Sequence, residues 1–175
     1  MFSIHSCPLP DGALLGAYHA NGAYADCFAT DIAGLVSHEQ FVTAFYTTSL
    51  FKLERAILKW AVARPATDAQ AKQLASGSID AFAAWTVEQR APNQLLLADF
   101  LGRTRSWLMV APVTVSKAPG TRLYFGSAMV PAKNRKTGQA QLGLVFKALL
   151  GFHKLYSVLL LRAAKARLAA LQESA

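Results

Sequence analysis

Hydrophobic and polar positions alternate in some stretches of the chain and recur every three to four residues in others. A short apolar run at Tyr24–Thr30 predicts a first strand, with Tyr24 and Asp26 on one side and Cys27 on the other. Four later runs, rich in leucine, valine, threonine and aromatic residues, predict further strands at 82–88, 94–101, 104–115 and 122–130. The turns between these later strands are short, which allows only antiparallel neighbours, so they form a meander.

Helical spacing appears in three places. The segments 37–40 and 67–70 each match the pattern of a capping box, which predicts that a helix begins there. Apolar residues recur at helical spacing through 41–61, and Gly77 is placed to end the second helix. A broad apolar arc predicts a long C-terminal helix at 142–172. Residues 1–22 show little periodicity and are expected to wrap the surface as an irregular segment.

This order of elements predicts a single α+β domain over residues 1–175, with the helix-grip architecture. A strand, two or three short helices, a meander and one long helix favour a curved antiparallel sheet packed around the C-terminal helix. Several strands are apolar on both faces, as at Leu95–Leu97 and Trp107–Val110. An antiparallel sheet of this kind must be covered on both faces or line a cavity.

Composition narrows the class of protein. A hydrophobic fraction of 53% excludes intrinsic disorder and indicates a large core or an apolar cavity. No stretch is long and uncharged enough to cross a membrane, and the first basic residue is Lys52, so a secretory signal is not expected. We therefore expect a cytoplasmic protein, in which Cys7 and Cys27 are reduced thiols.

Charge is distributed unevenly along the chain. Residues 1–100 hold six basic and nine acidic residues, a net charge of −3, whereas residues 101–175 hold twelve basic residues and one acid, a net charge of +11. Such a basic half indicates an anionic partner, of which a membrane surface is favoured, or a solvated face without a partner. Nucleic acid is disfavoured because the aromatic residues follow the apolar stripe instead of alternating with the charges.

Three stretches resemble a bacterial branch of the START-like helix-grip (SRPBCC) superfamily that has no assigned activity: Gly102–Val110, Thr121–Ala128 and Leu150–Tyr156. The resemblance implies a deep apolar pocket between the sheet and the C-terminal helix, used for lipids, sterols or polyketides. Some members of the superfamily are cyclases or hydrolases, so the fold alone does not decide the activity. The chain departs from the family in its strand count, since the sequence predicts five strands and the family usually has seven.

Asp99 is the one acidic residue in an otherwise apolar strand, and a buried carboxylate there needs a partner. A two-residue turn would place it opposite Ser106, and a three-residue turn would place it opposite Arg105. It could fix the register of the hairpin, anchor a ligand in the pocket or act as a catalytic acid or base.

We expect the protein to bind an apolar or amphipathic small molecule between the sheet and the C-terminal helix. Aromatic side chains with polar tips and a few polar anchors are typical of such pockets. The candidate ligand-binding residues are Trp85, Asp99, Arg105, Trp107, Tyr124, Met129, Phe152 and Tyr156.

Two alternatives stay open. One is a cyclase or hydrolase that uses Asp99, Arg105 and Tyr124 in the cavity, and the other is a peripheral membrane or interaction protein that uses the basic half. The sequence holds no nucleophile elbow, phosphate-binding loop or metal-ligand spacing, so no cofactor or metal is expected. The surplus apolar surface of the C-terminal helix suggests a homodimer as a further partner.

Overall fold

The computed structural model describes residues 3–53, 66–130 and 144–173, with the side chains of the last helix described from Lys154 onward. Seven strands form one sheet in the order β1-β2-β7-β6-β5-β4-β3, and every neighbouring pair is antiparallel. The strands are β1 (His5–Ser6), β2 (Tyr24–Ala33), β3 (Ala81–Phe82), β4 (Trp85–Ala91), β5 (Gln94–Asp99), β6 (Thr104–Val115) and β7 (Ala118–Met129). The helices are α1 (Gly16–Ala20), α2 (His38–Tyr46), α4 (Asp68–Ser76) and α5 (Leu144–Glu173).

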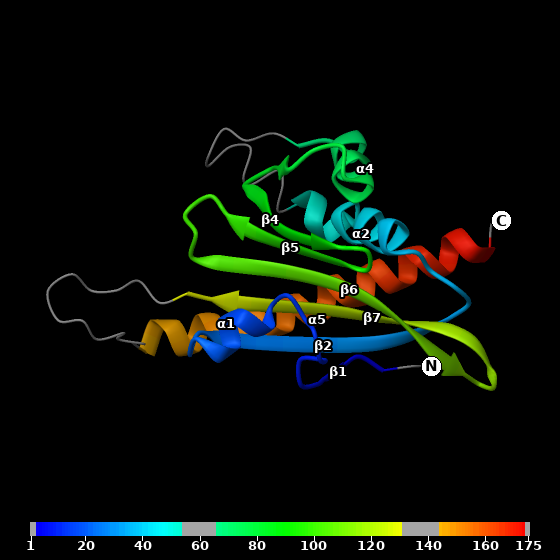
Figure 1. Cartoon of the computed structure of the whole chain (residues 1–175), viewed down its shortest axis with the longest axis horizontal. Coiled ribbons are helices and arrows are strands. Elements are labelled where there is room, and N and C mark those ends of the chain that lie inside the picture. Colours follow the sequence, from blue (N-terminus) through cyan, green and yellow to red (C-terminus); the bar gives the residue numbers. More distant parts are fainter. Residues whose placement is uncertain (1–2, 54–65, 131–143, 174–175) are drawn as a thin grey trace, which may run out of the picture.

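The expected α+β class, with a curved antiparallel sheet packed on a long C-terminal helix, is confirmed (Figure 1). The strand count is corrected from five to seven, because β1 and β3 are only two residues long. Elements this short leave no periodic pattern in a sequence. The expectation that 1–22 is irregular is corrected too, since this segment contains β1 and the short helix α1.

Local signals placed the helix starts correctly. Ser37 and Thr67 each cap a helix with the full reciprocal capping box, and Gly77 ends α4 in the left-handed conformation at φ 82°. The predicted helical run 41–61 is interrupted, because α2 ends at Tyr46. Its last part lies in 54–65, outside the described residues.

One face of the sheet packs on α2, α4 and α5, and we call it the helical face. Its core includes Leu95, Leu97, Leu108, Leu123 and Phe125, which meet Leu160, Leu161 and Leu168 of α5. Aromatic rings fill the space beside them: Phe45 lies 4.8 Å from Phe125, and Tyr46 lies 4.8 Å from Phe51, centroid to centroid. This part of the sheet–helix interface is thus filled by protein side chains.

The opposite face, which we call the outer face, is covered by the N-terminal segment. Leu15 packs there against Trp107, Leu96 and Ala128. Gln94 holds the segment in place, because its side chain accepts hydrogen bonds from the Leu14 amide at 2.9 Å and the Trp107 indole at 2.8 Å, and donates to the Gly12 carbonyl at 3.1 Å. The two apolar faces are therefore both covered, one by helices and the other by the start of the chain (Figure 1).

Among the described residues, no helix combines the length and the apolar character that crossing a membrane requires.

Candidate functional site

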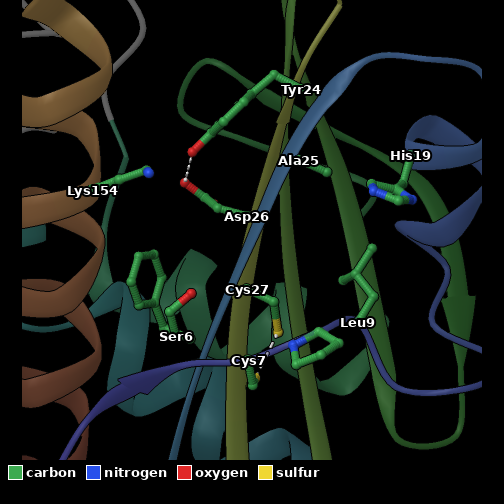
Figure 2. Close-up of a pocket in the computed structure, with 11 residues that line it drawn as sticks. Ser6, Cys7, Leu9, His19, Tyr24, Ala25, Asp26, Cys27 and Lys154 are labelled. Carbon is green, nitrogen blue, oxygen red and sulfur yellow. Dashed lines mark hydrogen bonds between the residues drawn. The ribbon is translucent and has the colours of Figure 1, made fainter.

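A pocket of about 460 Å³ opens at the edge of β2, where the N-terminal segment, β2 and α5 meet (Figure 2). Its volume falls in the range of about 300–1,000 Å³ that is typical of small-molecule sites. The lining combines apolar surface with a few polar groups, and its residues are Ser6, Cys7, Pro8, Leu9, His19, Tyr24, Ala25, Asp26, Cys27, Phe28 and Lys154.

The pocket exists because β1 stops early. Its last backbone contact with β2 is the hydrogen bond from the Cys7 amide to the Cys27 carbonyl, 3.0 Å long. Pro8 follows, and beyond Cys7 the described residues show no further backbone hydrogen bond from this segment to β2. Backbone groups alternate sides along a strand, so the N–H and C=O of Ala25 point to the same side as those of Cys27. Ala25 lies opposite Ala128 in the β2–β7 register, but no described residue forms a hydrogen bond with its N–H or C=O on the β1 side. One donor and one acceptor therefore face the pocket.

Asp26 is the acidic residue of the pocket, and both of its oxygens are already engaged. One accepts hydrogen bonds from the Ser127 hydroxyl at 2.6 Å and the Ser127 amide at 3.2 Å, and the other accepts from the Tyr24 hydroxyl at 3.2 Å. Burial and the neighbouring carboxylate raise the pKa of Tyr24 well above its usual value, so the phenol stays protonated and keeps donating. The acid therefore links β2 to β7 and has little capacity left for a ligand.

Lys154 supplies the positive charge. Its ammonium lies 5.9 Å from the centre of the Tyr24 ring, and Figure 2 shows it on the α5 side of β2, facing Tyr24 and Asp26. The side chain is exposed and forms no hydrogen bond or ion pair with the described residues. The uncommitted charge of the pocket is thus positive, whereas its negative charge is already partnered.

The opposite wall is formed by the N-terminal segment. Leu9 and His19 lie there on the other side of β2 from Lys154 (Figure 2). Half-buried Leu9 gives this wall an apolar surface next to Ala25, and exposed His19 adds a polar group at the end of α1. The pocket therefore has an apolar side and a cationic side.

None of the seven sequence-predicted site residues whose side chains the structure describes lines this pocket. Three of them lie on the outer face. Trp107 is fully buried, Tyr124 packs 6.1 Å from it, and Arg105 bonds the Tyr18 hydroxyl at 2.8 Å and the Glu88 carboxylate at 2.7 Å. The Arg105 contacts join β6 to the N-terminal segment and to β4. All three residues thus lie on the face of the sheet that is opposite α5.

Asp99 takes a different partner from either expected one, and this is a correction. The observed register pairs Ala98 with Arg105 and places Ser106 opposite Leu97. The Asp99 carboxylate instead accepts hydrogen bonds from the amides of Arg103 at 2.6 Å and Thr104 at 3.0 Å. It caps its own turn, as aspartate often does.

The other four candidates lie on the helical face or in α5. Trp85 and Tyr156 are half-buried against the core, and Met129 lies opposite Tyr24 in the β2–β7 register. The Phe152 side chain lies outside the described residues. Asp99, Arg105 and Tyr124, which the enzyme alternative requires in one cavity, thus bind separate partners.

The sequence itself carries two signals for this pocket. Asp26 is an acid inside an apolar strand, as Asp99 is, and the requirement for partners applied equally to it. Two prolines at 8 and 10 indicate that any strand in this segment lies at the edge of the sheet or ends there. The approach of Lys154 could not be predicted, because it depends on how α5 lies across the sheet.

Comparison with known proteins gave no match among family models, curated proteins or solved structures. In the described ranges, histidine, cysteine and acidic side chains do not gather in groups of three or more that could hold a metal ion.

Proposed function

We propose that the protein binds an amphipathic organic anion, such as a fatty-acid carboxylate, in the pocket at the edge of β2. The observation that carries the proposal is the Lys154 ammonium, which has no ion-pair partner among the described residues and lines the same pocket as Ala25. The ligand would lie at the edge of β2, between the N-terminal segment and Lys154 of α5, and not in the filled part of the sheet–helix interface. Membership of the helix-grip superfamily is part of the same proposal, supported by the sheet order and α5.

The chemistry of the lining favours an anion over a neutral or cationic ligand. A carboxylate could accept a charge-assisted hydrogen bond from Lys154 and a further one from the Ala25 amide. The apolar part would lie against Leu9, which also packs on the outer-face core. The Asp26 carboxylate would repel the anion less than a carboxylate without hydrogen-bond partners would, because three hydrogen bonds already stabilise its charge.

Binding can be measured with a dansyl-labelled fatty acid whose fluorescence rises in an apolar site, and with dodecanoate as the displacing ligand. We expect Lys154→Met to weaken dodecanoate binding about tenfold or more, since a hydrogen bond to a charged group contributes about 1.5–3 kcal/mol. The matched control is Lys72→Met on α4, which removes the same charge at an exposed position outside the pocket. The control should bind as the wild type does.

Dodecanol separates the contribution of charge from that of the apolar chain. It should bind more weakly than dodecanoate to the wild type, and equally to the wild type and Lys154→Met. The proposal is wrong if dodecanoate fails to bind, or if the two lysine variants bind it equally well.

A further inference from the structure

Two thiols face each other in the wall of the pocket. The Cys7 thiol donates to the Cys27 sulfur across 3.5 Å, and both residues are free cysteines. Figure 2 shows the two sulfurs meeting between the end of β1 and β2.

Their backbone positions suit a disulfide. The register pairs His5 with Ala29 and Ser6 with Phe28, and the Cys7 amide bonds the Cys27 carbonyl at 3.0 Å, so the cysteines are directly opposite each other. Directly opposite residues of antiparallel strands have Cα atoms about 4.5–5.5 Å apart. Disulfides form across Cα distances of about 4.4–6.8 Å, so the bond needs only a movement of the side chains.

The two thiols differ in access. Both cysteines line the pocket, but Cys7 is half-buried whereas Cys27 is only 2% exposed. Burial raises the pKa of Cys27 well above its usual value, and the Cys7 thiol and the Asp26 carboxylate add to this effect. Cys7 is therefore the thiol that an oxidant meets first, and Cys27 is the slower partner.

We propose that Cys7 and Cys27 form an oxidisable dithiol that closes to a disulfide when it meets a small-molecule disulfide such as oxidised glutathione. Cys7 loses its proton to solvent, its thiolate attacks one glutathione sulfur, and the other glutathione leaves as a thiolate and takes up a proton. Cys27 then loses its proton to solvent and attacks the Cys7 sulfur, which releases the second glutathione. The protein loses two hydrogen atoms, and oxidised glutathione becomes two thiols.

The bond would fix the end of β1 to β2 beside the ligand pocket and close a loop from residue 7 to residue 27. The proposal does not rest on the proposed ligand, because it needs only the two sulfurs and the access to Cys7. Disulfides that lie near a surface are typically the more easily reduced ones, so the bond is expected to reopen with a thiol reductant.

The test is incubation of the reduced, folded wild-type protein with oxidised glutathione, followed by intact mass measurement after acid quenching. We expect the mass to fall by two hydrogen atoms with no glutathione retained, and to return with dithiothreitol. A protease that cleaves before aspartate separates the cysteines into peptides 1–10 and 26–30, which should appear linked only after oxidation. Trypsin is unsuitable, because the first basic residue is Lys52.

Serine variants establish the order of the two steps. Cys27→Ser should stop as a mixed disulfide that retains one glutathione on Cys7, and Cys7→Ser should react at least tenfold more slowly than the wild type. The proposal is overturned if the wild type stays reduced, retains glutathione or becomes a disulfide-linked dimer. The wild-type result stands even if a serine variant folds poorly.

Discussion

Three aspartates show how single side chains connect strands in this protein. Asp31 forms a two-pronged ion pair with Arg122, with bonds of 2.6 and 2.9 Å, which lowers the pKa of Asp31. Asp26 connects β2 to Ser127 of β7, and Asp99 caps its own turn. The sheet register brings the donors to Asp26 and Asp31, whereas Asp99 takes its donors from the turn that follows it, and all three partly buried charges are thereby partnered.

His38 differs from these charged aspartates, because burial keeps its side chain neutral. Burial is the largest cause that lowers its pKa, to about 4 from an ordinary 6.5, and nearby Arg90 adds to this shift, whereas a hydrogen bond to the Leu108 backbone opposes it. The unfolded chain therefore binds a proton more readily than the folded protein between these two values. The contribution of His38 to the free energy of unfolding is therefore complete above pH 6.5 and declines as the pH falls toward 4.

We expect the free energy of unfolding of the wild type to fall by about 2 kcal/mol between pH 7 and pH 5 on account of His38. Urea denaturation at the two pH values measures this difference. His38→Gln keeps a polar side chain without the titration and should lose most of the difference, whereas His19→Gln, at an exposed position, should retain it. An unchanged pH dependence in His38→Gln would show that another group causes the acid destabilisation.

At the scale of elements, the sequence predicted well what depends on local signals. Ser37, Thr67 and Gly77 mark helix ends through their own hydrogen bonds and backbone angles, and these were predicted correctly. Runs such as Leu95–Leu97 predicted that both sheet faces are covered or line a cavity, and the structure shows both faces covered by other parts of the chain. The sequence did not predict which element covers which face. Trp107 and Tyr124 alternate with the helical-face residues, and no local pattern shows which of the two alternating sets faces the helices.

The pocket was missed for a related reason. It depends on a two-residue strand that ends at a proline and on a lysine of α5 that approaches from far along the chain. Long-range placement of this kind has no periodic signature in the sequence.

Gly126 shows how closely the N-terminal segment packs on the outer face. A Cβ atom there would lie 2.8 Å from the Asp26 carbonyl oxygen, 2.9 Å from Leu15 Cδ2 and 2.9 Å from Trp107 Cε3. We expect Gly126→Ala to lower the free energy of unfolding by about 1–3 kcal/mol, since the backbone oxygen cannot move aside easily.

The matched control is Gly16→Ala in α1, where an added Cβ meets nothing within 4 Å. It should change stability by less than about 0.5 kcal/mol. Chemical denaturation of both variants tests the packing, and equal stabilities would mean that the N-terminal segment is not held against Gly126 as described.

At the scale of the whole molecule, both faces of the sheet are covered and the edge of β2 is left partly open. The helical face packs on α5, and the outer face packs on the N-terminal segment. These two layers meet at the β2 edge, where they leave the pocket of about 460 Å³. The basic second half of the chain contributes Lys154 to this place and so favours an anion there.

Nuclear magnetic resonance tests most directly whether the ligand binds in the pocket at the edge of β2. Dodecanoate is titrated into the ¹⁵N-labelled protein, and the backbone amide signals are followed. We predict that the Ala25 amide moves downfield and saturates, together with the signals of Leu9 and Lys154, because the free edge gains a hydrogen bond. Saturating shifts confined to other parts of the chain, with Ala25 unmoved, would contradict the account.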